Sequence, residues 1–194
     1  MNKNNTLSVI TACYNEENII KKNIINWAKY FNKIKEIKKF EIIITDDGST
    51  DDTYKILKKL KTQIKELKIF KLKKNQGASF AFRNSLSKAS YKFVLINDSD
   101  NQFPISNFKI LWKEINKSKR DAVFGARNRF KEINFLSIGS FISGKILNLV
   151  YAAKVKDFNC AFKLIKLELA RKIKLETVGL NYSTEMTAKI LELT

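Results

Sequence analysis

The sequence predicts an α/β domain in which helices cover both faces of a mainly parallel sheet. Short apolar, β-branched runs alternate with longer segments whose apolar residues recur at helical spacing. Acid-bearing segments follow three of the first four apolar runs, at the sheet edge where ligands bind in such folds. A length of 194 residues and a hydrophobic content of 44% suit one domain with its own core. We therefore expect one three-layer α/β/α domain over residues 1–194, truncated at its C-terminus if the final helical pattern is incomplete.

Strands and helices are expected to alternate through the first half of the chain. Between the strands, apolar residues spaced three or four apart, such as Ile20 and Ile24, mark the inner face of each helix. Ser49 or Thr50 is predicted to cap the second helix, and Ser106 the fourth. The predicted strands of this half are Leu7–Cys13, Phe40–Thr45, Leu67–Leu72, Phe93–Ile96 and Ala122–Gly125.

The second half is less regular. It predicts a helix over Ser137–Ala153, a strand over Phe162–Lys166 and a last helix over Ser183–Leu193. The apolar residues of 133–153 are expected either to pack on the sheet or to lie on a membrane surface, where neighbouring lysines would meet anionic head groups. No uncharged apolar stretch reaches the ~18 residues that a membrane-crossing helix needs.

Composition limits the classes of function. The formal charge of +18 favours anionic partners, but the acids lie where a nucleic-acid backbone would be repelled, so no nucleic acid is expected. The absence of histidine excludes a Ser-His-Asp triad and histidine-ligated metals. Cys13 and Cys160 have neither zinc nor disulfide spacing, and no apolar signal region precedes the first strand. We therefore expect a cytoplasmic protein, with peripheral contact to the membrane face as an option.

The acidic segments predict a metal site. "CYNEEN", "DDGSTDD" and "NDSDNQ" each follow an apolar strand, which would gather Glu16, Asp47, Asp98 and Asp100 on one rim. Packed carboxylates repel one another unless a cation neutralises them. Oxygen ligands suit Mg²⁺ or Mn²⁺, and these ions take further ligands from substrate phosphates. The rim is therefore a candidate site for a divalent ion with a bound diphosphate.

Seven segments together resemble a known family. "SVITACYNEENI", "EIIITDDGSTDDT", "NQGASFAFRNSLSKAS" and "FVLINDSDNQFP" resemble the inverting family-two glycosyltransferases, which have the nucleotide-sugar-binding, Rossmann-like GT-A fold. The "DSDNQFP" form is most similar to the polyprenyl-phosphate sugar transferases, the group of dolichyl-phosphate mannose synthase. "FGARNRF", "VKDFNCAFKLIK" and "LNYSTEMTAKIL" resemble later segments of that group. The family's subsequent basic Gly-x-Ser-Lys loop is missing, which leaves the acceptor open.

The resemblance implies a nucleotide subsite and a metal subsite. Tyr14, Glu16 and Asp47 would hold the base and ribose. Ala12 lies at the same strand exit, where many members have proline. The metal and diphosphate would be held by Asp98, Asp100 and Gln102.

Three later residues complete the implied site. Arg127 would contact a phosphate of the donor or acceptor, Asp157 would lie near the sugar, and Glu185 would be a pocket residue. Cys160 and Ala161 replace the family's Ser-Gly, which would reshape the sugar pocket.

The expected function is therefore transfer of a hexose from a UDP- or GDP-sugar, with Mg²⁺ or Mn²⁺, to a polyprenyl phosphate. An ionised lipid phosphate needs no general base. If the acceptor is instead a saccharide hydroxyl, Asp157 or Glu185 would have to take its proton. A third alternative is a module that binds nucleotide sugar without catalysis.

Overall fold

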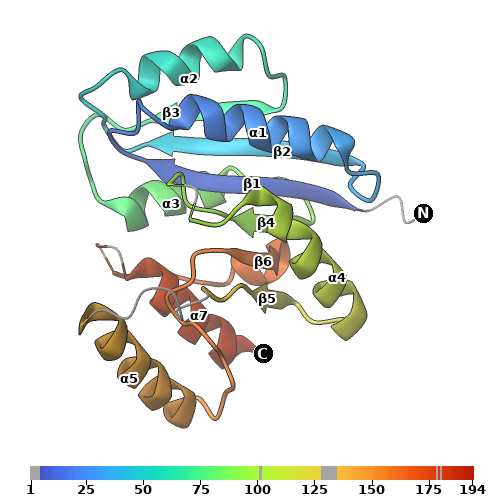
Figure 1. Cartoon of the computed structure of the whole chain (residues 1–194), viewed down its shortest axis with the longest axis vertical. Helices are drawn as coiled ribbons and strands as arrows, with labels where there is room; N and C mark the ends of the chain where they lie inside the picture. Colours follow the sequence, from blue (N-terminus) through green and yellow to red (C-terminus); the bar gives the residue numbers. More distant parts are fainter. Residues whose placement is uncertain (1–4, 101, 128–134, 178, 180) are drawn as a thin grey trace.

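The computed structural model describes residues 5–100, 102–127, 135–177, 179 and 181–194. Strands and helices alternate as the apolar pattern predicts (Figure 1). The strands are β1 (Thr6–Cys13), β2 (Lys39–Asp46), β3 (Leu67–Lys71), β4 (Phe93–Ile96), β5 (Ala122–Phe124) and β6 (Lys163–Lys166). The helices are α1 (Ile20–Lys33), α2 (Thr53–Lys61), α3 (Ala78–Ser87), the short 3₁₀ helix η1 (Ile105–Asn107), α4 (Phe108–Ser118), α5 (Phe135–Val150), α6 (Leu167–Ala170) and α7 (Tyr182–Leu193).

The six strands form one sheet in the order β3-β2-β1-β4-β6-β5. β1 pairs in parallel with β2 and β4, and β2 pairs in parallel with β3, whereas β6 runs antiparallel to both β4 and β5. The prediction of a mainly parallel sheet is therefore confirmed. The connections from β1 through β4 each contain a helix, because parallel neighbours require a long crossover.

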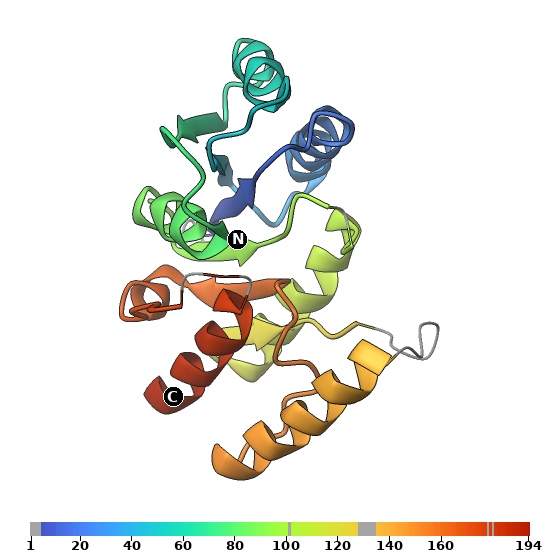
Figure 2. The ribbon, with the colours of Figure 1, turned by 90° about the vertical axis from the view of Figure 1, so that its left-hand side faces the viewer.

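Two cores lie on the two faces of the sheet, because successive strand side chains point to opposite faces. On β1, Val9 faces the core formed with α1, α2 and α4, whereas Ile10 faces the core formed with α3, α6 and α7. Ile42 and Ile43 of β2 divide in the same way. Figure 2 shows α1 and α4 on one side of the sheet and α3 on the other. The predicted three-layer α/β/α arrangement is confirmed.

Both predicted helix caps are wrong. Asp52, not Ser49 or Thr50, occupies the N-cap position of α2. The hydroxyl of Ser49 is used elsewhere, because it accepts a hydrogen bond from the backbone N–H of Asn15 in the loop after β1. Ser106 lies inside η1, a 3₁₀ turn that leads directly into α4, so the cap position falls one residue later. Tertiary contacts and local turn geometry thus moved the helix starts.

A buried carboxylate near the start of β2 forms hydrogen bonds with side chains of both neighbouring strands. Glu41 of β2 is 2% exposed and accepts hydrogen bonds from Ser8 Oγ of β1 at 2.6 Å, from Ser90 and from Lys68 Nζ of β3. Burial alone would raise the pKa of Glu41, but the bonds from Lys68, Ser8 and Ser90 outweigh burial and hold that pKa below its ordinary 4.5.

We expect Glu41→Gln to lower the free energy of unfolding by about 2 kcal/mol near neutral pH, the usual magnitude for hydrogen bonds to a charged group. A lowered folded-state pKa stabilises the fold above the ordinary value of 4.5 and loses that effect as the pH falls through the folded pKa. Urea titrations of wild type and variant should therefore converge in acid. Glu36→Gln, at an exposed carboxylate, is the control. A pH-independent difference would contradict the assignment.

Candidate active site

The site forms where the chain changes direction across the sheet. β2 lies on one side of β1, and the crossover through α3 places β4 on the other side of β1. The loops after β1 and β4 therefore separate and leave a crevice, the usual ligand position in such folds. A cavity of about 500 Å³ occupies this edge, which faces the viewer in Figure 2. The predicted site residues that line it are Ala12, Tyr14, Glu16, Asp47, Asp98, Asp100, Gln102 and Arg127.

The loops after β2 and β3 fit closely against each other. Asp47 is 3% exposed, and its carboxylate accepts hydrogen bonds from the backbone N–H groups of Gln76 at 2.8 Å and Gly77 at 2.9 Å. Gly48 has a φ of +74°, and a Cβ there would lie 2.6 Å from the backbone carbon of Lys74. This position requires glycine both for its backbone conformation and for the close approach. Asp47 is thereby fixed in the cavity wall.

The loop after β1 is fastened to the loop after β2. Asn15 adopts a φ of +54°, and its side-chain Oδ1 accepts the N–H of Thr50 at 2.9 Å. The N–H of Glu16 donates to Thr53 Oγ1 at 2.7 Å. These bonds leave Tyr14 44% exposed at the cavity, where its ring is available to a ligand.

Besides Asp47, three carboxylates line the cavity, and they come from two loops. Asp98 and Asp100 follow β4, and Glu16 follows β1 with its Oε1 accepting a hydrogen bond from Ser99 Oγ at 3.3 Å. Burial raises the pKa of Asp98, and the charge of Asp100 adds to that rise. Burial also raises the pKa of Glu16, with further contributions from Asp100, Asp51 and Asp98. Burial is the larger cause of both shifts, and repulsion between the neighbouring carboxylates adds to it.

This acidic cluster fits a divalent cation that shares its coordination with a ligand. Within the described ranges, no group of three or more acids or cysteines could hold a metal ion by itself. The two carboxylates after β4 supply hard oxygen donors, and Gln102 lines the cavity beside them. A bound cation would offset both the burial of the Asp98 and Glu16 carboxylates and the repulsion from their acidic neighbours, which together raise their pKa values. Such a site needs oxygen atoms from the ligand or from water to complete its coordination.

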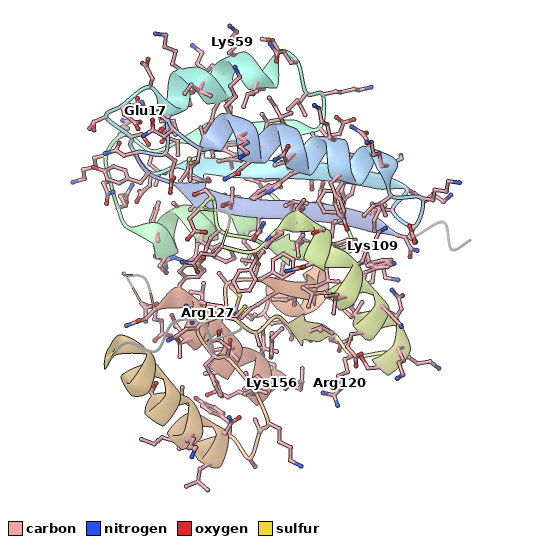
Figure 3. All side chains as sticks on the ribbon, in the orientation of Figure 1. Glu17, Lys59, Lys109, Arg120, Arg127 and Lys156 are labelled. Atoms are coloured by element: carbon pink, nitrogen blue, oxygen red, sulfur yellow. The ribbon has the colours of Figure 1, made fainter. Side chains whose placement is uncertain are left out.

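Arg127 and Asp157 form a bidentate ion pair beside the cavity. Arg127 Nε and Nη2 donate to the two carboxylate oxygens of Asp157 at 2.8 and 3.1 Å. The Asp157 side chain is 1% exposed, whereas that of Arg127 is 38% exposed and lines the cavity. Figure 3 labels Arg127 just beyond the end of β5. Asp157 instead lines a smaller neighbouring cavity of about 240 Å³ beside α5. The hydrogen bond to Asp157 raises the pKa of Arg127 further.

Glu185 does not line the large cavity. It lies in the first turn of α7, where its carboxylate accepts the N–H groups of Glu176 and Thr177 at 2.7 and 3.0 Å and pairs with Lys189. Burial alone would raise the pKa of Glu185, but the Thr177 hydroxyl, the two N–H groups and Lys189 together lower it to about 2. Glu185 is therefore engaged in holding the 176–177 segment.

Replacing Glu185 with glutamine is expected to affect stability more than chemistry. It should lower the free energy of unfolding by about 2 kcal/mol at neutral pH, because several hydrogen bonds to a charged acceptor are weakened. With the folded-state pKa near 2, the stabilisation is complete above 4.5 and fades as the pH falls toward 2. Thermal melts across pH 2–7 and a transfer assay would check this; a large loss of turnover without a loss of stability would contradict it.

The sequence pattern does not predict three candidate residues of the site. Tyr182 and Ser183 line the cavity from the first turn of α7, although their segment predicts only a helix. Beneath them Lys163 is fully buried, and its ammonium donates to Ser183 Oγ at 2.6 Å. A lysine inside the apolar strand "FKLIK" was the available signal for the last of these, because lysine is almost never fully buried without partners.

Fold and site together define the class: a GT-A-type α/β domain with an acidic pair where its strand order reverses. The chain belongs to the family described as glycosyl transferase family 2, whose sequence model matches residues 8–174. The family and fold that the motifs resemble are thus confirmed.

Two relatives carry names that refer to polyprenyl phosphates. The dolichyl-phosphate beta-glucosyltransferase of Dictyostelium discoideum is 29% identical over 182 residues, which cover 86% of this chain and 56% of that protein. The dodecaprenyl-phosphate galacturonate synthase of Rhizobium johnstonii is 24% identical over 171 residues, which cover 87% of this chain and 50% of that protein. The chain thus spans about half the length of these relatives.

Among solved structures, glucosyl-3-phosphoglycerate synthase from Mycobacterium tuberculosis matches with a TM-score of 0.68 and 18% identity. The match covers 93% of this chain and 63% of that chain, and the complex contains Mn²⁺, UDP and glucosyl-3-phosphoglycerate. At this identity the likeness supports the fold.

Proposed function

We propose that this protein transfers a hexose from a nucleoside diphosphate sugar to a polyprenyl phosphate, with inversion at the anomeric carbon. The observation that carries the proposal is the engagement of both candidate bases. Asp157 accepts two hydrogen bonds from the Arg127 guanidinium, and Glu185 is bonded outside the cavity. A hydroxyl acceptor would need a carboxylate to take its proton, whereas a phosphate acceptor is already ionised. The site therefore favours an ionised acceptor.

The donor is proposed to lie along the crevice between the loops after β1 and β4. Tyr14, Glu16 and Asp47, with Ala12 at the strand exit, form the end that would hold the base and ribose. Asp98, Asp100 and Gln102 form the end that would hold the diphosphate and Mg²⁺ or Mn²⁺. A bound ion would supply positive charge to the departing diphosphate.

The reaction is a single displacement. An acceptor phosphate oxygen forms a bond to the anomeric carbon while the bond from that carbon to the diphosphate oxygen breaks, and the nucleoside diphosphate leaves with the electron pair. Arg127 would stabilise the negative charge that develops on it, and Asp157 holds the guanidinium in place. No covalent enzyme nucleophile is required, and a single displacement inverts the configuration.

A polyprenyl-phosphate acceptor would require the site to work at a membrane surface. Within the ranges that the structure covers, no helix combines the length and apolar character that a bilayer crossing needs. On α5, however, Ile146, Leu149 and Val150 are 57%, 83% and 69% exposed, and α5 lies apart from the sheet in Figure 1. With Lys154 and Lys156 after it, this face is proposed to rest on an anionic membrane. Absence of co-sedimentation with anionic liposomes at low salt would reject this contact.

A two-stage experiment tests the function. Thermal shifts with UDP-, GDP- and dTDP-sugars, with and without Mn²⁺, should reveal a metal-dependent donor. Product assays should then compare polyprenyl phosphate with saccharide acceptors. Transfer to a saccharide alone would favour the hydroxyl-acceptor alternative, and donor binding without any product would favour a nucleotide-sugar-binding module.

A further inference from the structure

A tyrosine from the last helix reaches the acid at the end of β4. Tyr182 Oη donates a hydrogen bond to Asp98 Oδ1 at 2.8 Å. The two residues are 84 positions apart in the chain, so this contact exists only in the folded protein. This bond fixes one of the two carboxylate oxygens of Asp98 to a side chain of α7.

Tyr182 is held rigidly in this position. The residue is 7% exposed, and its ring stacks on Phe82 of α3 with the ring centres 4.9 Å apart and the planes at 22°. A phenol has an ordinary pKa of about 10, so the Tyr182 hydroxyl carries its proton at neutral pH. The hydroxyl is thus a permanent donor aimed at one carboxylate oxygen.

The next residue of α7 makes a second connection below the cavity. Ser183 Oγ accepts from the ammonium of Lys163, which also donates to the backbone carbonyl of Cys160. Burial lowers the pKa of Lys163 to about 8, while the charges of Asp98 and Asp157 counteract that shift. The first turn of α7 is therefore fastened to β6 as well as to the loop after β4, which limits its freedom to move away from Asp98.

We propose that Tyr182 is a positioning residue that fixes the orientation of the Asp98 carboxylate and thereby sets the affinity of the site for a divalent cation with nucleoside diphosphate. Because the tyrosine holds Oδ1, the Asp98 side chain stays in one rotamer. Its other oxygen, Oδ2, is then free to bind the cation. A group that orients a metal ligand through its second oxygen commonly changes metal affinity by about 10- to 100-fold when it is removed. This inference rests on the proposed function.

The test uses the full chain with Tyr182→Phe, which deletes the hydroxyl and keeps the ring that stacks on Phe82. MnCl₂ is titrated by calorimetry in the presence of saturating UDP, and separately GDP. We expect Mn²⁺ affinity to fall about 10- to 100-fold while the melting temperature without metal stays close to that of wild type. Tyr151→Phe is the matched control, because it deletes a tyrosine hydroxyl that donates to the exposed Glu192 away from the cavity. It should bind Mn²⁺ like wild type.

A second comparison separates action through Asp98 from a general effect. Adding Tyr182→Phe to Asp98→Asn should weaken Mn²⁺ binding much less than Tyr182→Phe does alone, since the ligand that the tyrosine orients is already impaired. Equal losses in both backgrounds would overturn the inference, as would equal Mn²⁺ affinity in wild type and Tyr182→Phe. In the latter case the proposed function stands. If wild type binds no Mn²⁺ with either nucleotide, both the proposed function and this inference fail.

Discussion

Asp98→Asn is expected to lower the transfer rate by at least about 10²- to 10³-fold, comparable to removing one group that stabilises transition-state charge. The substitution removes a negative charge from the cavity but keeps an oxygen that can accept the Tyr182 hydroxyl. Burial raises the pKa of Asp98, which means that the folded protein disfavours its ionised form. The variant should therefore be at least as stable as wild type near neutral pH when metal is absent, although its transfer rate is much lower.

The difference in stability between Asp98→Asn and wild type should depend on pH. A carboxyl whose pKa is raised in the folded protein lowers the free energy of unfolding once the pH exceeds its ordinary pKa of 3.8. The stability gain of Asp98→Asn should thus appear above that pH and vanish below it. Melting temperatures and rates for Asp98→Asn and Asp100→Asn would be compared with Asp121→Asn, an exposed acid paired with Lys166 outside the cavity. Unchanged turnover in both cavity variants would reject the metal and diphosphate role.

Arg127→Ala is expected to impair both activity and stability. Transfer should fall about 10²-fold or more, because a cation facing the departing diphosphate is lost. Asp157, 1% exposed, would lose its bidentate partner. Breaking a buried ion pair typically costs about 3–5 kcal/mol, and the 38% exposure of Arg127 reduces the expected loss of unfolding free energy to roughly 2–3 kcal/mol. Arg127→Lys should recover little, since an ammonium cannot form the two parallel bonds.

A double substitution separates the two effects. Asp157→Asn added to Arg127→Ala removes the buried negative charge that has lost its guanidinium partner, so it should restore part of the stability without restoring turnover. Urea titrations and steady-state rates on the single and double variants would check this. Recovery of both properties together would show that Arg127 serves only to neutralise Asp157.

Local sequence patterns were sufficient for most of the fold. β-branched runs ending in acids predict the parallel strands and their ligand edge, and burial of Val9 and Ile10 on opposite faces confirms the two-sided sheet. The helix caps failed because hydroxyl and carboxylate groups near a helix start have several possible partners. Ser49 bonds to the distant loop after β1 rather than to its own helix. The spacing of residues in the sequence does not show which of these hydrogen-bond partners a side chain will take.

The gathering of acids at one edge of a parallel sheet and the family motifs can both be read from the sequence. The way in which those acids are held depends on contacts that form only in the folded chain. Asp47 is fixed by the N–H groups of the next loop, and Asp98 is held by Tyr182 from a helix 84 residues later. Arg127 and Asp157 form an ion pair in which the carboxylate is buried, so that only Arg127 remains exposed at the cavity. Strand periodicity is a local property, whereas hydrogen-bond partners and burial depend on contacts between segments far apart in the chain.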